Sequence, residues 1–205
     1  AGMGMANAAM TTQKMLDEYH PKAVLLSGIA GAIDSAVKIG DIVVCSEWIE
    51  HDYGYIGKDG FQSDSLAVYI PSKNNVVNEK VFHADSAMLA MARVIEAESL
   101  KLQVVGDRTP QLRVGGVGVT GNQFIDSKEK RAWLTKEFKA EITDMESSAV
   151  AQVCTVNGVP FVIFRSASDL AGGSGSSTAQ VEIEQFFKHA AANSATVVIE
   201  YLRRI

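Results

Sequence analysis

Two carboxyl side chains stand where acid–base or hydrogen-bonding chemistry would be useful, and the first is Glu146. It lies at the junction between a short strand-like run, residues 141–143, and a run with helical periodicity, residues 146–156. A charge in the first turn of a helix, with Asp144 or a neighbour as the cap, is one interpretation. The other is a carboxylate that accepts hydrogen bonds from two neighbouring hydroxyl groups, as a ribose diol offers. The sequence leaves both open on position alone.

The second carboxyl belongs to Asp169, which comes with Arg165 and Ser168 directly after the apolar run 161–164. Polar residues at such a place are costly unless they are paired or lie at a site. An aspartate that starts a turn is one interpretation. The other is a general acid, or an anchor that forms hydrogen bonds with a heterocycle.

Other motifs give weaker signals. His51-Asp52 follows a strand-like run, and a structural pair or an interface explains it as well as catalysis does. Gly116, Gly118 and Gly121 match the spacing of the dinucleotide fingerprint, which opens directly into a helix. Here residues 122–126 intervene before any helix. A close-packed or bulged strand is therefore favoured, and a nicotinamide-dependent oxidoreductase remains an alternative that rests on these glycines alone.

Apolar runs that alternate with helical periodicity must position these side chains. Helices are expected over residues 7–19, 85–98, 128–137 and 146–156 and again near the end of the chain. Strands are expected over residues 23–26, 42–49, 114–120, 141–143 and 161–164. Residues 27–31 are expected to form a turn, and residues 51–81 a long excursion that carries several aromatic side chains. This alternation predicts an α/β, doubly wound, largely parallel sheet, in which ligands bind beyond the carboxyl ends of the strands.

Composition excludes several classes of protein. The 205 residues include 47% hydrophobic and 21% charged residues and carry a formal net charge of −5. No basic stripe suits a nucleic acid, and no apolar run is long enough to span a membrane. Cys45 and Cys154 stand in apolar surroundings, so two buried thiols are favoured over a disulfide. The four histidines are scattered, and no zinc site is predicted.

A series of motifs in order along nearly the whole chain resembles the nucleoside phosphorylase and nucleosidase superfamily. The branch most similar is the one whose nucleosidases act on 5′-methylthioadenosine and S-adenosylhomocysteine. The motifs are Ser27-Gly28-Ile29-Ala30-Gly31, Lys38-Ile39-Gly40-Asp41-Ile42-Val43-Val44, His51-Asp52, Gly121-Asn122-Gln123-Phe124-Ile125, Asp144-Met145-Glu146 and Ser168-Asp169.

The resemblance implies a three-layer αβα sandwich around a mixed, largely parallel central sheet. It implies one nucleosidase-like domain over residues 1–205, with the family's first strand and a water-activating glutamate upstream of Ala1. It also implies a homodimeric cytoplasmic enzyme of methionine salvage that hydrolyses the N-glycosidic bond of an adenine nucleoside. Neither a metal nor another cofactor is implied, and the expected partner is the small purine nucleoside. A targeting segment upstream of Ala1 stays open.

The resemblance also implies roles for individual residues. Asp169, oriented by Ser168, would donate a proton to purine N7, and Glu146 would hold the ribose hydroxyls. The remaining substrate-binding positions are Met145 against the ribose, Phe124 stacked on the purine, the Ile125 backbone on the purine edge, Arg165 as electrostatic support, and Ile29 and Tyr55.

Departures from the family pattern keep alternatives open. The phosphorolytic relatives carry a serine and an arginine for phosphate where this chain has Ile29 and Leu26. An apolar side chain does not bind phosphate, so water is the expected nucleophile. The glycine-rich loop after Asp169 is similar to that of a divergent branch that includes plant storage proteins. A purine nucleoside phosphorylase and a non-catalytic nucleoside-binding protein of the same fold therefore remain alternatives.

Overall fold

A computed structural model describes residues 2–98 and 100–205 of the chain. The helices are α1 (Met5–Tyr19), α2 (Ser86–Ala97), α3 (Lys128–Phe138), α4 (Ser147–Asn157) and α5 (Ala179–Leu202). The strands are β1 (Val24–Ala32), β2 (Ile42–Val44), β3 (Glu47–Glu50), β4 (Gly54–Gly57), β5 (Gly60–Ser63), β6 (Leu66–Ile70), β7 (Asn75–Glu79), β8 (Phe82–His83), β9 (Leu112–Val114), β10 (Val117–Thr120), β11 (Ala140–Asp144) and β12 (Phe161–Leu170).

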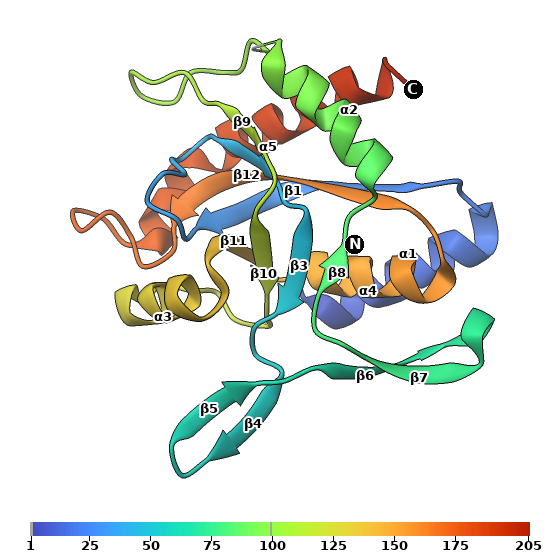
Figure 1. The fold of residues 1–205 in the computed structure, drawn as a ribbon. Helices are drawn as coiled ribbons and strands as arrows, with labels where there is room; N and C mark the ends of the chain where they lie inside the picture. The colour runs from blue at the N-terminus through green and yellow to red at the C-terminus, as the bar shows by residue number, and fades with distance from the viewer. Residues whose placement is uncertain (1, 99) are drawn as a thin grey trace.

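The central sheet has the strand order β8-β3-β10-β11-β1-β12-β2-β9. Four neighbouring pairs run parallel and three run antiparallel, among them β1 with β11. In Figure 1, α2 and α5 cover one face of this sheet, and α1, α3 and α4 lie on the other. The expected three-layer sandwich around a mixed sheet is confirmed. Because β1 meets β11 only through the last residues of each strand, the carboxyl ends of both strands come together in the middle of the sheet.

The expected turn over residues 27–31 is wrong, because β1 continues through it to Ala32. Parallel pairing with β12 along the whole strand supplies the hydrogen bonds that a turn would have lost. The two glycines of this stretch face side chains of β12 instead. A Cβ on Gly28 would lie 2.0 Å from Nη1 of Arg165, and one on Gly31 would lie 2.9 Å from Oδ1 of Asp169. Glycine is therefore needed here for close approach.

The expected strand over residues 161–164 is too short, because β12 runs on to Leu170. Ser168 and Asp169 thus lie within a strand and not after it. Ala30 pairs with Ala167 and Gly31 pairs with Asp169, so Ser168 has no Cα partner across the pair. Such a bulge re-aims the neighbouring side chains. It places both the Ser168 and Asp169 side chains in the interior, where each is 2% exposed or less.

Two other expected strands divide in the structure. Residues 42–49 form β2 and β3, which pair with different neighbours, β2 with β12 and β9 and β3 with β10 and β8. Residues 114–120 are interrupted at Gly115 and Gly116, whose φ angles are 122° and 77°. Gly118 lies inside β10 directly beneath the Trp48 ring, and α3 starts only at Lys128. The close-packed strand is confirmed, and the fingerprint spacing has a packing origin.

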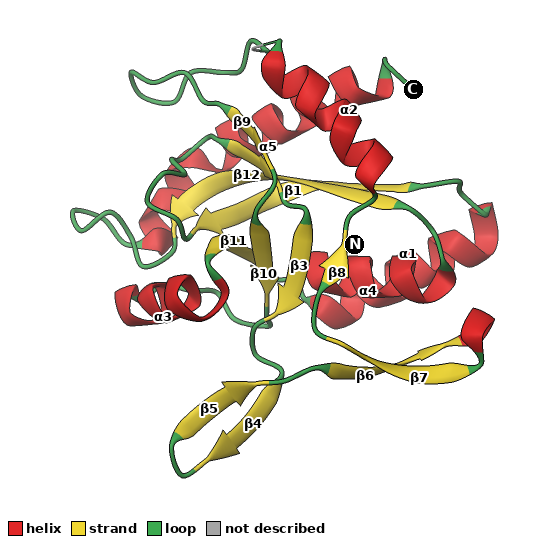
Figure 2. Cartoon of the chain, viewed as in Figure 1, coloured by secondary structure: helices red, strands yellow, loops and turns green. Residues whose placement is uncertain are grey.

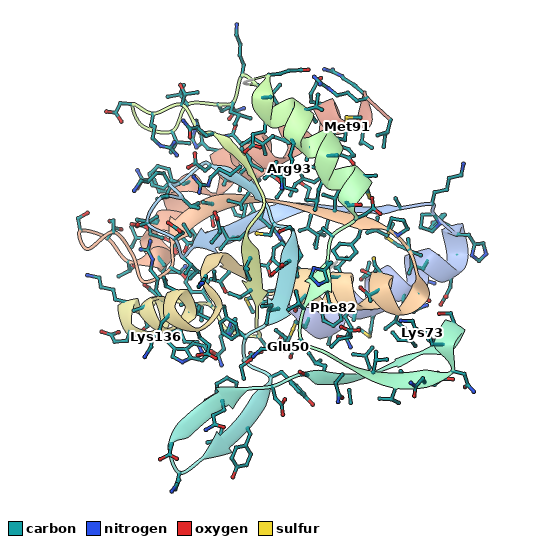
Figure 3. The ribbon with its side chains drawn as sticks, viewed as in Figure 1. Glu50, Lys73, Phe82, Met91, Arg93 and Lys136 are labelled. Carbon is teal, nitrogen blue, oxygen red and sulfur yellow. The ribbon has the colours of Figure 1, made fainter. Side chains whose placement is uncertain are left out.

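The excursion over residues 51–81 consists of two hairpins, β4–β5 and β6–β7. Both stand apart from the central sheet in Figure 2, and β4–β5 projects farthest from the body. Figure 3 shows Lys73 at the tip of the β6–β7 hairpin, whereas Phe82 of β8 is buried in the main core at 1% exposure. Tyr55 and Ile56 on β4 are 65% and 78% exposed. An isolated hairpin with exposed apolar side chains is marginal in water.

The main core lies between the sheet and its helices, with a second, smaller cluster beneath α3. Cys45 and Cys154 are both free and buried, as expected. Burial raises the pKa of the Cys154 thiol to about 12. Within the part of the chain that the structure describes, none of the helices has the length and apolar character to cross a membrane.

Candidate active site

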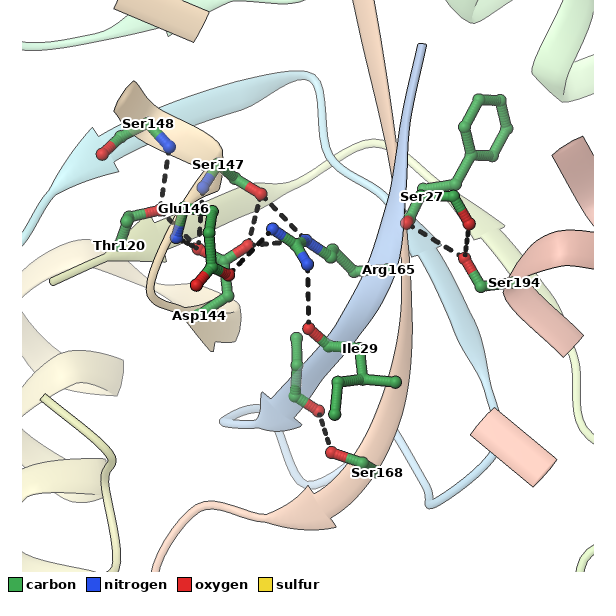
Figure 4. A network of polar contacts seen from close by, with 12 residues as sticks. Ser27, Ile29, Thr120, Asp144, Glu146, Ser147, Ser148, Arg165, Ser168 and Ser194 are labelled. Atoms are coloured by element: carbon green, nitrogen blue, oxygen red, sulfur yellow. Dashed lines mark hydrogen bonds and ion pairs between the residues drawn. The ribbon is translucent and has the colours of Figure 1, made fainter. Parts of the chain in front are cut away.

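Arg165 stands at the centre of a polar network where β1, β11 and β12 meet (Figure 4). Its Nε lies 2.7 Å from Oδ2 of Asp144 and donates to Oγ of Ser147 at 3.0 Å. Its Nη1 donates to the Ile29 carbonyl at 3.2 Å, and its Nη2 donates to Oε2 of Glu146 at 3.3 Å. The guanidinium is buried, so this set of acceptors replaces its hydration.

Asp144 anchors that network to the start of α4. Its Oδ1 accepts from the Ser147 N–H at 3.1 Å and from the Thr120 hydroxyl at 2.6 Å. Oδ2 accepts from the Ser147 hydroxyl as well as contacting Arg165. Asp144 thus accepts from the first N–H of α4, although the N-cap position itself belongs to Glu146. One buried carboxylate therefore ties the end of β10, the start of α4 and the middle of β12 together.

Glu146 precedes the helix, because α4 begins at Ser147 and not at Glu146. Its carboxylate makes no cap bond to α4. Instead Oε1 accepts from the Gly4 N–H at 2.9 Å, and Oε2 accepts from Arg165. Gly4 is the N-cap of α1 and has a φ of 91°, which favours glycine. The side chain is 20% exposed, so the carboxylate is both fixed and accessible.

The structure places three of the predicted substrate-binding residues, Met145, Phe124 and Ile125, in different settings. Met145 is partly buried between Asp144 and Glu146. Phe124 is 45% exposed, whereas the neighbouring Ile125 is 6% exposed and belongs to the cluster beneath α3. The Ile125 carbonyl accepts from the Gly172 N–H at 3.2 Å. The 124–125 segment is thereby tied to the loop that follows Asp169.

Asp169 occupies a less polar setting than Glu146. Its Oδ2 accepts from the Ser168 hydroxyl at 2.8 Å, and its buried Oδ1 has no hydrogen-bond partner among the described residues. Burial raises the pKa of the Asp169 carboxyl from 3.8 to about 6. The bond from Ser168 opposes this rise, and the charges of Glu182 and Asp126 add to it. A carboxyl group whose pKa is close to neutral pH, and whose Oδ1 is available to a ligand, can hold a proton and donate it.

Asp169 and Arg165 stand four residues apart on β12, with the bulge at Ser168 between them. A carboxyl suited to proton donation therefore lies at one end of this span. At the other end lies a carboxylate bound to a guanidinium. This arrangement can hold a polar ligand at both ends and protonate it at one.

Two sequence candidates lie outside this cluster within one chain. Tyr55 belongs to the projecting β4–β5 hairpin. His51 is fully buried, and neither ring nitrogen has a hydrogen-bond partner in residues 2–98 and 100–205. Burial lowers the pKa of its imidazole. A Cβ on Gly121 would lie 2.5 Å from that ring, so His51 supports the segment that leads to Phe124.

Sequence reasoning missed several residues that complete the site. Gly4 donates to Glu146, and Asn122 accepts from the Met5 N–H at 3.0 Å, so the start of α1 is part of the cluster. A glycine directly before a helical run was the available signal for Gly4. The ion pair between Asp144 and Arg165 had no such signal, since the two residues are 21 positions apart and meet only through the sheet topology.

Comparison with known proteins agrees with this fold. The family model of the phosphorylase superfamily matches residues 1–203. The 5′-methylthioadenosine/S-adenosylhomocysteine nucleosidase of Bacillus cytotoxicus is 30% identical over 206 residues, which cover all of this chain and 79% of that protein. The chain belongs to the phosphorylase superfamily. Within it, the similarity extends to proteins named as nucleosidases.

Two solved structures show the same likeness. The nucleosidase of the same name from Colwellia psychrerythraea, solved in complex with adenine, has a TM-score of 0.79 and 30% identity. The alignment covers 99% of this chain and 75% of that one. The futalosine hydrolase of Helicobacter pylori also has a TM-score of 0.79, with 26% identity over 99% of this chain and 77% of that one.

Proposed function

We propose that this chain hydrolyses the N-glycosidic bond of an adenine nucleoside of the methylthioadenosine and S-adenosylhomocysteine type, releasing free base and sugar. The observation that carries the proposal is the contrast between Asp169 and Glu146 in a chain of this superfamily. One carboxyl is buried with a pKa of about 6, and the other contacts Arg165. Cleavage of a nucleoside requires a proton on the leaving base and a fixed carboxylate near the sugar.

At the base end, Asp169 is the proposed general acid. Protonation of purine N7 withdraws electrons from the glycosidic bond as it breaks, so adenine leaves as a neutral molecule. The hydrogen bond from Ser168 fixes one carboxyl oxygen and leaves Oδ1 free for the purine. Phe124 would stack on the purine ring, and the Ile125 backbone would meet its edge. The tie from Ile125 to Gly172 supports this part of the site.

At the sugar end, Glu146 is proposed to accept hydrogen bonds from the two ribose hydroxyls, with Met145 against the ring. The transition state resembles an oxocarbenium ion, so a fixed negative charge near the sugar lowers its free energy. Arg165 and the Gly4 N–H hold the carboxylate in place before the substrate arrives. Such preorganisation is the main source of electrostatic catalysis.

Water is the proposed nucleophile. Its oxygen bonds to the anomeric carbon as the carbon–nitrogen bond breaks, and one of its protons is lost to a base. None of the described residues is proposed as that base. Ile29 and Leu26 stand where the phosphorolytic relatives bind phosphate, and neither side chain can do so.

Tyr55 is proposed to act only in a homodimer. Its hairpin carries exposed apolar side chains and projects from the central sheet in Figure 2. A second copy would cover these side chains and give Tyr55 access to a neighbouring site.

The test is an assay of the full-length protein for released base. Methylthioadenosine, S-adenosylhomocysteine, adenosine, inosine and futalosine should each be incubated with and without phosphate. Adenine release that does not depend on phosphate is the expected result. A requirement for phosphate would assign the chain to the phosphorylases, and nucleoside binding with no release would assign it to the non-catalytic relatives. Hypoxanthine release from futalosine in preference to adenine release would change the proposed substrate.

A further inference from the structure

Glu182 lies in the first turn of α5, and it is unusual because its carboxylate is buried. Its side chain is buried, with 3% of the residue exposed. Both carboxylate oxygens accept from the backbone of a different segment, Oε2 from the Leu170 N–H at 2.8 Å and Oε1 from the Ser174 N–H at 2.9 Å. The carboxylate thus bridges the two ends of the loop that follows Asp169.

Stabilisation of the helix dipole does not explain this burial, because an exposed carboxylate would serve that purpose equally. Glu184, two residues further along α5, is exposed and accepts a hydrogen bond from Gln180 on the same helix. No lysine or arginine forms an ion pair with Glu182 in the described part of the chain. A buried carboxylate without a cation is costly, and its two charge-assisted hydrogen bonds offset that cost.

The bridged loop is connected to the base end of the proposed site on both sides. It begins next to Asp169, and Gly172 within it donates to the Ile125 carbonyl. Gly172 and Gly173 have φ angles of 89° and 72°, which glycine adopts at low cost. Such a loop keeps one conformation only when it is tied to its surroundings; backbone bonds to Ile125 and Ala32 hold its middle, and Glu182 holds both of its ends.

The charged groups that act on Asp169 come from three elements. Glu182 lies on α5 and Asp126 lies on the loop before α3, and both raise the pKa of the Asp169 carboxyl. Arg131 on α3 lowers it. Because Glu182 is buried beside the loop, its charge acts on Asp169 with little screening by solvent.

From this geometry we propose that Glu182 is a positioning residue for Asp169: its carboxylate fastens the loop from Leu170 to Ser174 and keeps a negative charge beside the proposed acid. The inference rests on the proposed role of Asp169 and adds a residue that acts through it. Glu182 itself touches neither base nor sugar in this account.

The experiment compares Glu182→Gln with the matched control Glu184→Gln in the full-length protein. Carboxyl ¹³C NMR follows the titration of Asp169, assigned by its loss in Asp169→Asn. Hydrogen exchange follows the amides of Leu170 and Ser174. In Glu182→Gln we expect the Asp169 midpoint to move below its wild-type position near pH 6. We also expect at least one of the two amides to exchange about tenfold faster, since a charge-assisted bond is lost.

The control should leave both readouts at the wild-type values. A third variant, Glu182→Asp, keeps the charge with a shorter reach, so it should return the Asp169 midpoint toward wild type while the loop amides still exchange faster. Unchanged titration and exchange in both Glu182 variants would overturn the inference. Neither readout requires turnover, so a protein that releases no base would refute the proposed function without deciding the role of Glu182.

Discussion

Glu146 and Asp169 are carboxyl groups at the two ends of the proposed site, and the structure surrounds them in opposite ways. Glu146 is partly exposed and accepts from Arg165 and the Gly4 N–H. Asp169 is buried, accepts from Ser168 alone among the residues that the structure describes, and has two further carboxylates nearby that raise its pKa. The side chains differ by one methylene, so the surroundings and not the residue types separate the two roles.

The largest expected effect comes from Asp169→Asn, which keeps the shape of the side chain and removes its proton-donating carboxyl. We expect kcat for release of adenine from methylthioadenosine to fall by about 10²–10⁴-fold, the range for loss of a general acid. The exposed aspartate Asp107 provides a matched control, and Asp107→Asn should retain wild-type kcat. Equal rates for Asp169→Asn and wild type would assign the proton donation to another group.

The next effect is on stability and concerns the sugar end. Arg165→Met removes the cation and leaves the Asp144 carboxylate buried without an ionic partner. We expect the free energy of unfolding in urea to fall by about 3–5 kcal/mol, as for other buried ion pairs broken on one side. The control is Arg113→Met, because Arg113 forms a 3.4 Å pair with Glu141 and is 34% exposed. That variant should lose no more than about 1 kcal/mol.

The smallest effect concerns the base end and depends on pH. Folding raises the pKa of the Asp169 carboxyl from 3.8 to about 6, so the folded state favours the protonated form. This preference stabilises the protein fully at pH values below 3.8, and the stabilisation is lost as the pH rises through 6. Asp169→Asn removes that titration. The variant should therefore exceed wild type in free energy of unfolding by about 1–3 kcal/mol at pH 7. Urea denaturation at pH 4 and pH 7 measures this gain, which should be absent at pH 4.

Several features of this fold could be predicted from the sequence because they depend on local patterns. The periodicity of α1 and α2 and the start of α4 near Glu146 are examples. The apolar runs located the strands but not their ends. β12 continues through Arg165, Ser168 and Asp169 because β1 pairs with it, and residue type alone gives no sign of such pairing.

The candidate site also has residues that local patterns indicate and contacts that only the fold determines. Asp169 and Glu146 stood out because each is a carboxyl beside a strand-like run. Their partners could not be predicted, since Gly4 and Glu146 are 142 positions apart and meet only after the sheet has formed. In the sequence, nothing distinguishes Glu182 from other acidic residues near the start of a helix. Only the fold shows that its carboxylate oxygens accept from the loop after Asp169. Contacts between distant segments are set by topology, and one sequence does not fix topology.

The measurement that tests the central claim most directly changes the leaving group. In a 5-methylthioribose derivative with nitrophenolate in place of adenine, the leaving group departs without being protonated. We predict that Asp169→Asn, although slowed by about 10²–10⁴-fold on methylthioadenosine, cleaves this substrate within about tenfold of the wild-type rate. Glu146→Gln should be impaired on both substrates, because the sugar is the same. Equal impairment of Asp169→Asn on both substrates would contradict the division of roles between the two carboxyl groups.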